Sequence, residues 1–176
     1  MFIGLIWWDG LMCSRLAAVW GVMGVCALLM FAVMRLMTHV IAMWSMPLST
    51  LQWVLMTTFL VFMLYTEGYR GFQKSFSPRV VARAQYLSQH SNPVWIVFAP
   101  LFCMSYFAAP KQRIVVSIVL TLAIVSLVVG MRYIPQPWRG MIDLGVVCGL
   151  SWGMLSLLYC SWQAVSGKLT ADPQVQ

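Results

Sequence analysis

The chain has 176 residues, of which 61% are hydrophobic and only 9% are charged, and its mean hydropathy is +0.84. Soluble domains carry about 25% charged residues, so this composition excludes an ordinary soluble protein and indicates one integral membrane domain over residues 1–176. The formal net charge is +7, but the basic residues stand at the ends of apolar segments, where they orient helices and contact lipid, so we expect no nucleic-acid partner.

Five apolar segments are predicted to form membrane-spanning helices, which makes the expected fold an all-α polytopic bundle. A bilayer core of about 30 Å takes about 20 helical residues, and helices satisfy their own backbone hydrogen bonds in lipid. The third segment is the shortest, and Pro100 in its middle predicts a kink because proline lacks a backbone donor. The predicted spans are 16–36, 48–67, 94–109, 114–131 and 142–162.

The first predicted span and the loop after it contain two patterns. Ala17 and Gly21 are four residues apart, which places two small residues on one helix face for close packing. Further on, Met37, His39 and Met43 offer thioether and imidazole ligands that suit Cu(I). Since 14 methionines are spread through the chain, apolar packing is the simpler interpretation, and we expect no cofactor. Copper(I) binding stays a lower-ranked alternative.

The segment 67–93 is predicted to form a polar loop at the membrane surface. Glu67 follows the second span, and Gly68 and Gly71 allow the chain to turn there without steric clash. A serine and a proline then give the start signal of a helix at about 78–89, with its apolar residues on one side. We expect this basic amphipathic helix to lie on the cytoplasmic surface of the membrane.

Cations and an aromatic residue near this loop are the predicted site for lipid phosphate or an acidic partner. Arginine can hold a phosphate through two parallel hydrogen bonds, and a tyrosine ring suits the membrane interface. The predicted site residues are Glu67, Tyr69, Arg70, Arg79, Arg83 and Arg139. We also predict ion pairs of Glu67 with Arg70 and of Asp143 with Arg139, because carboxylates at a membrane border need partners. The alternative is that these bases only set the topology.

Three glycines recur every four residues in the fifth predicted span, at Gly145, Gly149 and Gly153. This spacing places them on one helix face, where another backbone can approach closely. Two interpretations stay open, namely close packing against a neighbouring helix and a homo-oligomer interface.

With five spans, the amino end is predicted in the cytoplasm and the carboxyl tail outside, because the cytoplasmic side carries more Lys and Arg. The predicted cytoplasmic bases are Arg15, Arg70, Lys74, Arg79, Arg83, Arg132 and Arg139, and the predicted external ones are Arg35, Lys111, Arg113 and Lys168. The sequences Glu67-Gly-Tyr-Arg-Gly-Phe, Ser77-Pro-Arg-Val and Pro137-Trp-Arg-Gly resemble those of a group of small multi-pass bacterial membrane proteins without an assigned activity. The resemblance implies a location in the bacterial inner membrane.

Motifs of known enzymes are missing from the sequence, which has no HExxH, no GxSxG and no phosphate-binding loop. We therefore expect no catalytic residues and no enzymatic activity. The expected function is that of a small subunit, assembly partner or lipid-contacting accessory factor of the membrane, with lipids and either another membrane protein or further copies of the chain as partners. The alternative is a small oligomeric transporter or channel, although the predicted spans hold no charged residue at mid-depth.

Overall fold

The computed structural model describes residues 3–89 and 93–167, and every regular element in these ranges is a helix, as predicted. The α-helices are α1 (Ile3–Trp44), α2 (Thr50–Met63), α3 (Ser77–Leu87), α4 (Pro93–Val97), α5 (Ala99–Cys103), α6 (Lys111–Gly130) and α7 (Trp138–Val165). A π-helix, η1 (Leu64–Phe76), joins α2 to α3, and a short 3₁₀ helix, η2 (Met131–Tyr133), follows α6.

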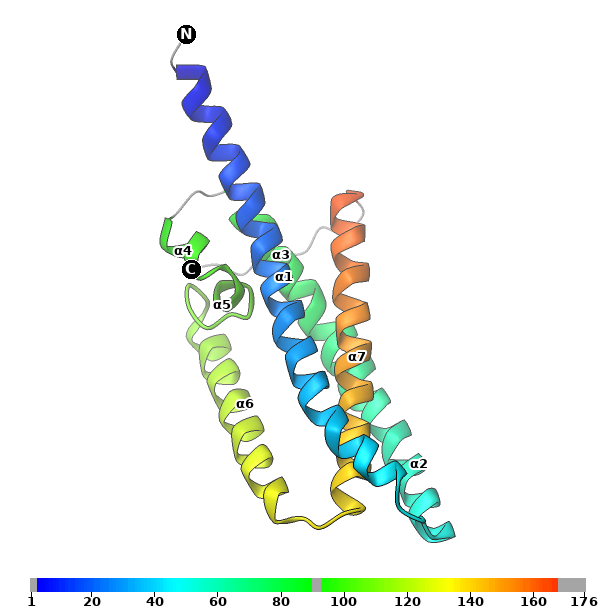
Figure 1. The fold of residues 1–176 in the computed structure, drawn as a ribbon. Helices are drawn as coiled ribbons and strands as arrows, with labels where there is room; N and C mark the ends of the chain where they lie inside the picture. The colour runs from blue at the N-terminus through cyan, green and yellow to red at the C-terminus, as the bar shows by residue number, and fades with distance from the viewer. Residues whose placement is uncertain (1–2, 90–92, 168–176) are drawn as a thin grey trace.

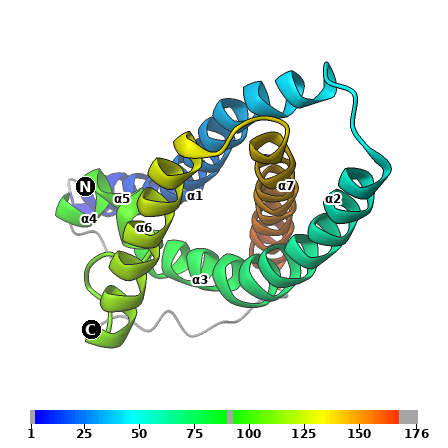
Figure 2. The same ribbon diagram turned by 90° about the horizontal axis from the view of Figure 1, so that it is seen from below.

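The helices form a bundle of four long passes. α1 runs from the upper to the lower end in Figure 1, α2 with η1 and α3 returns, α6 runs down again and α7 runs up. Seen from below in Figure 2, α7 lies between α1 and the returning helix, and α6 stands at the edge. The start of α1 and the end of α7 therefore lie at the same end of the bundle.

One continuous helix runs from Thr50 to Leu87, in place of the predicted surface loop and separate helix. A capping box starts it, because Ser49 accepts a hydrogen bond from the Gln52 amide and the Gln52 side chain accepts one from the Ser49 amide. The residues at both ends of η1 keep helical dihedral angles, so the chain does not turn there. We call this element, α2–η1–α3, the long helix.

The prediction of a turn at Gly68 and Gly71 was wrong, since both lie inside η1. A Cβ at Gly68 would come 3.1 Å from Cγ of Trp152 on α7, so this glycine allows close helix packing. The surface location predicted for the helix at 78–89 was wrong as well. Most residues of α3 are buried, and its apolar residues join a core cluster with Phe102 and Leu157.

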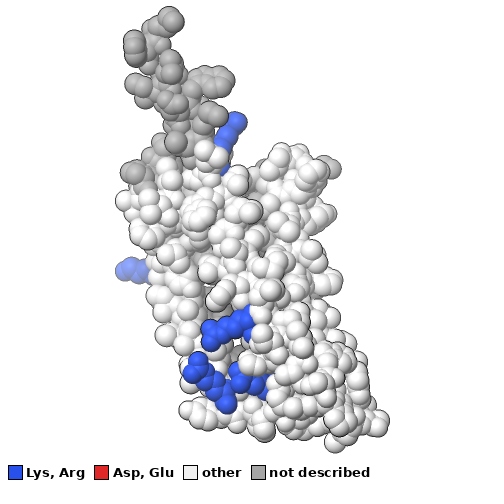
Figure 3. Space-filling model, viewed as in Figure 1, with Lys and Arg blue, Asp and Glu red and all other residues white. Residues whose placement is uncertain are grey.

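Three helices are long and apolar enough to cross a membrane, namely 15–44, 111–133 and 138–165, and they contain the first, fourth and fifth predicted spans. The predicted second span occupies α2 and the start of η1. Figure 3 shows a largely uncharged face of the bundle, with a few Lys and Arg side chains and no Asp or Glu. Such a surface suits contact with lipid.

The predicted third span, 94–109, is not a spanning helix. It consists of α4 and α5, of five residues each, followed by irregular backbone in which Ser105 and Ala108 have positive φ angles of 64° and 49°. Five helical residues rise only about 7.5 Å. Pro100 lies in the first turn of α5 and does not kink a longer helix. A Cβ at Gly24 would come 2.4 Å from Cγ of Pro100, so α1 needs glycine at this contact.

Candidate functional site

Polar side chains line the interface of α7 with α1 and the long helix, in a bundle that is otherwise mainly apolar. We call this row the polar seam. It comprises His39 of α1, Glu67, Gln73 and Ser77 of the long helix, and Arg139, Asp143 and Ser156 of α7. Gln136, which precedes α7, bonds the lower end of the seam to α1.

The glycine face of α7 allows the helices beside the seam to approach closely. A Cβ at Gly145 would come 2.6 Å from Cε1 of Phe59, and one at Gly153 would come 2.5 Å from Cδ1 of Phe72. Both contacts are shorter than real Cβ atoms make, so neither position tolerates a larger residue without movement of its neighbour. The glycine face therefore packs against the long helix of the same chain, which is the close packing against a neighbouring helix that the first interpretation describes.

Ala17 and Gly21 of α1 also lie in a contact within the chain. Ala17 is buried in the core cluster that contains residues of α3, α5 and α7. A Cβ at Gly21 would come 2.8 Å from Sγ of Cys103. The small residues of α1 therefore make room for α5, just as the glycines of α7 make room for the long helix.

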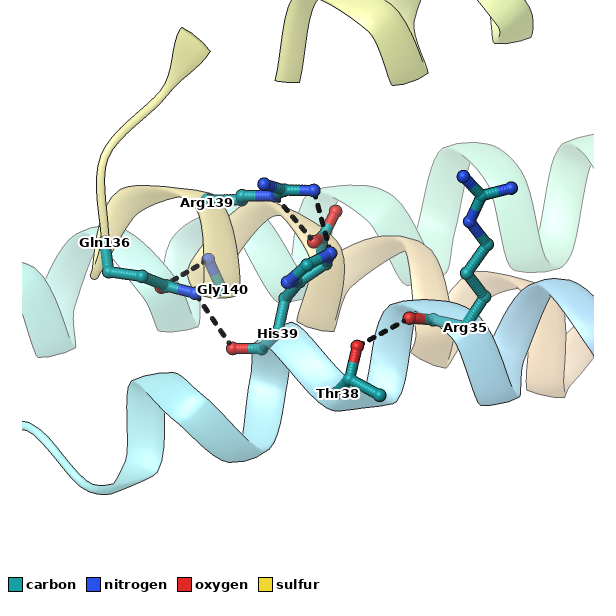
Figure 4. A network of polar contacts seen from close by, with 7 residues as sticks. Arg35, Thr38, His39, Gln136, Arg139 and Gly140 are labelled. Atoms are coloured by element: carbon teal, nitrogen blue, oxygen red, sulfur yellow. Dashed lines mark hydrogen bonds and ion pairs between the residues drawn. The ribbon is translucent and has the colours of Figure 1, made fainter. Parts of the chain in front are cut away.

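The lower end of the seam is a hydrogen-bonded network between α1 and α7 (Figure 4). Arg139 Nη2 lies 2.8 Å from His39 Nε2. Because a guanidinium nitrogen can only donate, Nε2 of His39 accepts this bond, and the ring proton is then on Nδ1. Gln136 donates to the His39 carbonyl oxygen at 3.2 Å and accepts from the Gly140 amide at 3.2 Å. These bonds fix the imidazole beside the guanidinium.

Asp143 forms the predicted ion pair with Arg139, and this pair is loose. Asp143 Oδ2 lies 3.9 Å from Arg139 Nε, which is too long for a hydrogen bond. Both atoms are buried without a hydrogen-bond partner among the described residues, and the whole Asp143 residue is only 4% exposed. A buried carboxylate oxygen without a donor carries a desolvation cost of about 1–3 kcal/mol. Asp143 Oδ2 thus keeps an unused capacity to accept a proton or a hydrogen bond.

Glu67 lies half-buried in η1, against the middle of α7. A Cβ at Gly149 would come 3.3 Å from Glu67 Oε2, and Gly149 is eleven residues from the start of α7 and sixteen from its end. No hydrogen bond or ion pair joins the Glu67 side chain to another described residue, so the predicted pair with Arg70 is not formed. Glu67 thus lies beside the middle of α7, one of the three helices that are long and apolar enough to cross a membrane.

Above Glu67, two side-chain hydrogen bonds continue the seam. Trp152 Nε1 donates to Gln73 Oε1 at 3.0 Å, and the buried hydroxyl of Ser156 donates to that of Ser77 at 2.9 Å. The π-helical geometry explains why these partners line up, because residues four or five apart then share a face. Gly68, Gln73 and Ser77 accordingly all face α7.

The predicted lipid-phosphate site is not assembled as a unit, and Arg83 in particular lies inside the bundle. Arg83 is 2% exposed and donates to the carbonyl oxygens of Phe102, Phe107 and Ala108 at 2.7, 2.8 and 3.1 Å. Its guanidinium also lies 4.1 Å from the centre of the Phe102 ring. The group therefore holds the irregular backbone after α5 in place, and it does not face lipid.

The other predicted members of that site are spread along the bundle. Tyr69 and Arg70 are exposed on η1, while Arg139 lies in the network with His39. Arg79 donates to a carbonyl of its own helix, and its guanidinium lies near that of Arg113. Arg79 and Arg113 thus form a basic pair at one end of α6.

The copper candidates also serve separate structural roles. Met43 is fully buried in an apolar cluster with Met56 and Met141, and Met37 packs against the cluster of Val33, Val40 and Val147. His39 is bonded to Arg139. Within residues 15–89 and 94–167, no three His, Cys, Asp or Glu side chains gather as metal ligands.

Sequence reasoning missed the seam because its parts are far apart along the chain. His39 and Arg139, which contact each other in the fold, are separated by 100 residues along the chain. The one local signal of the seam is the four-residue spacing of Arg139 and Asp143, from which their ion pair was predicted. Comparison with family models, curated proteins and solved structures gave no match to the chain.

Proposed function

We propose that the chain is a non-enzymatic integral membrane protein that moves a small cation, either a proton or a monovalent metal ion, along the polar seam. The observation that carries this proposal is Glu67, a carboxyl group without an ionic partner beside the middle of a candidate span. Ionisable groups at such depth are costly, and in membrane proteins they mark ion pathways and proton relays. The network of His39, Arg139 and Asp143 then provides a polar entrance at one end.

The arrangement of the passes supports four crossings of the membrane, with both ends of the chain on one side. Lys111 and Arg113 at the start of α6 then join Arg79 and Arg83 of the long helix, and Arg35, Arg132 and Arg139 stand opposite. By the positive-inside rule the side that holds the start of α1 and the end of α7 is cytoplasmic. The resemblance to small bacterial membrane proteins favours the inner membrane as the location.

Reconstitution into liposomes tests this proposal. Purified protein is placed in liposomes that contain a pH-sensitive dye, a potassium gradient with valinomycin sets the membrane potential, and proton, sodium and potassium flux are each measured. The native chain is expected to conduct one of these ions, and Glu67→Gln is expected to lose the flux. Arg70→Gln is the matched control, because Arg70 is exposed on the same helix and outside the seam. Flux no higher than in empty liposomes for all three ions would contradict the proposal.

A second candidate function, as an assembly partner or lipid-contacting subunit, is favoured by α6. No residue of α6 is buried, although the helix is apolar and long enough to span a membrane. Its contacts with the chain include Ser117, which donates to the Met104 carbonyl oxygen, and Thr121, which bonds the hydroxyl of Tyr106. The rest of its surface is available to lipid or to another protein. Photo-cross-linking from α6 positions in whole cells separates these cases, because a cross-linked second protein supports assembly and lipid adducts alone argue against it.

A further inference from the structure

We infer that the ion bound in the polar seam is the proton, and that Glu67 is its reversible binding group, which exchanges it with Asp143. This inference rests on the proposed function, because it identifies the species that the seam carries. It depends on three features of the structure, namely the apolar setting of Glu67, the incomplete pairing of Asp143, and the order of the two carboxyl groups along α7.

The setting of Glu67 provides too few ligands for a metal ion. A hard cation that loses its water requires several oxygen ligands. The side chains that pack on the turns of α7 beside Gly149 are instead apolar or aromatic, from Phe59, Met63 and Phe72. Among the residues whose side chains are described there is also no cluster of three His, Cys, Asp or Glu side chains. A proton needs only one carboxyl oxygen, so Glu67 alone suffices to bind it.

Nearby charges do not hold Glu67 in its ionised form. On its own helix, Arg70 and Lys74 are exposed, and Lys74 lies over the ring of Tyr69 at 4.6 Å. On α3, Arg79 and Arg83 donate to backbone carbonyl groups. Without a cation partner, a carboxyl group in an apolar setting is more stable in its neutral, protonated form.

Asp143 is buried like Glu67, but it differs from Glu67 in having basic groups beside it that oppose the effect of burial and favour its ionised form. Arg139 of its own helix lies at 3.9 Å and is itself bonded to His39 of α1, while Arg35 is a further cation on α1. Asp143 Oδ2 has no hydrogen-bond donor, so it is ready to accept a proton. Because the two environments differ in this way, we assign Glu67 as the proton donor and Asp143 as the proton acceptor.

Transfer between them needs a chain of water molecules, because one water molecule hydrogen-bonded to both groups spans only about 5–6 Å. Asp143 and Gly149 are six residues apart on α7, which corresponds to about 9 Å along the helix axis. In the transfer, the Glu67 carboxylic acid gives its proton to the first water, each water gives a proton to the next, the last gives a proton to the Asp143 carboxylate, and Glu67 is left ionised. Asp143 then releases the proton at the end of the bundle where α7 begins. Charge and atoms are conserved at each step.

Carbodiimide labelling tests the inference without measuring transport. N,N′-dicyclohexylcarbodiimide reacts with protonated carboxyl groups in apolar sites, and mass spectrometry of the full-length protein locates the adduct. We expect labelling at Glu67 that falls as the pH is raised between about pH 5 and pH 9. Glu67→Gln should remove this adduct, and Arg70→Gln should keep it. The absence of an adduct at Glu67 in folded protein, or labelling that does not change with pH, would overturn the inference.

Two measurements distinguish this inference from the proposed function, namely protection of Glu67 from labelling by added salts and ion flux in liposomes. If sodium or potassium chloride, but not choline chloride, protects Glu67 from labelling, a metal ion is the bound species and the inference fails. Sodium or potassium flux without a pH-dependent adduct would leave the proposed function standing and reject the inference. A pH-dependent adduct without any flux would support the proton site and reject transport. Asp143→Asn should keep the Glu67 adduct and slow proton flux, whereas unchanged flux would remove Asp143 from the transfer.

Discussion

Replacing Arg83 with alanine is expected to destabilise the protein more than any other single change to a basic residue. The guanidinium is buried and is the donor for the carbonyl oxygens of Phe102, Phe107 and Ala108. Phe102 belongs to α5, where its carbonyl oxygen also accepts from the Ser105 amide, and Phe107 and Ala108 belong to the irregular backbone after α5. Alanine removes the donors and leaves the acceptors in place.

The size of the effect follows from the groups left behind. A buried acceptor that loses its donor costs about 1–3 kcal/mol, and two carbonyl groups, those of Phe107 and Ala108, are left in this state, since the Phe102 carbonyl oxygen keeps the Ser105 amide as a donor. Loss of the contact with the Phe102 ring adds about 0.5–2 kcal/mol. Water that enters the space recovers part of this cost, so we expect a loss of about 3–5 kcal/mol, as when a buried charged network is broken. Such a loss is a large share of the stability of a typical domain.

Unfolding in mixed micelles by increasing fractions of sodium dodecyl sulfate measures this loss through tryptophan fluorescence. Arg83→Lys should be intermediate, because an ammonium group keeps the charge but cannot reach three separated acceptors in one plane. Lys111→Ala is the control, since Lys111 is exposed at the start of α6. If Arg83→Ala changed the free energy of unfolding by no more than Lys111→Ala, the structural role assigned to Arg83 would be refuted.

Further predictions concern the packing of α7. Gly153→Ala should lower the free energy of unfolding by about 1–3 kcal/mol, because its Cβ overlaps the Phe72 ring. Gly130→Ala should instead be neutral or stabilising by up to about 1 kcal/mol, since a Cβ there meets nothing within 4 Å; equal effects in the same micelle assay would contradict the close contact. Ser156→Ala should cost about 1 kcal/mol by leaving the Ser77 hydroxyl without its partner, whereas the double change with Ser77→Ala should be less costly than the single change. A double variant no more stable than Ser156→Ala would exclude this hydrogen bond as the cause.

The helical class and three of the spans could be predicted because both follow from local composition. Long apolar segments must satisfy their backbone hydrogen bonds internally, and this holds whatever they pack against. The pair of Arg139 and Asp143 was predictable for the same reason, since residues four apart on a helix are neighbours. Each of these predictions depends only on residues that lie within about twenty positions of one another in the sequence.

The failures arise where a distant contact decides the local structure. Gly68 suggests a turn when its neighbours alone are considered, but Trp152 packs on it and the helix continues. The segment after Pro93 looks like a short span, but Arg83 binds the carbonyl groups of its irregular backbone. The setting of Glu67 was missed for the same reason, because it depends on the position of Gly149 on another helix.

The π-helix η1 changes the period at which side chains of the long helix face α7. In α2 and α3, positions repeat about every 3.6 residues, but in Leu64–Phe76 the hydrogen bonds join residues five apart and each turn holds more residues. A cysteine accessibility scan along residues 50–87 should therefore show a protection pattern that lengthens its period after Met63 and shortens it again at Ser77. Helical-wheel projections with a single period would assign Glu67 and Ser77 to the wrong relative faces.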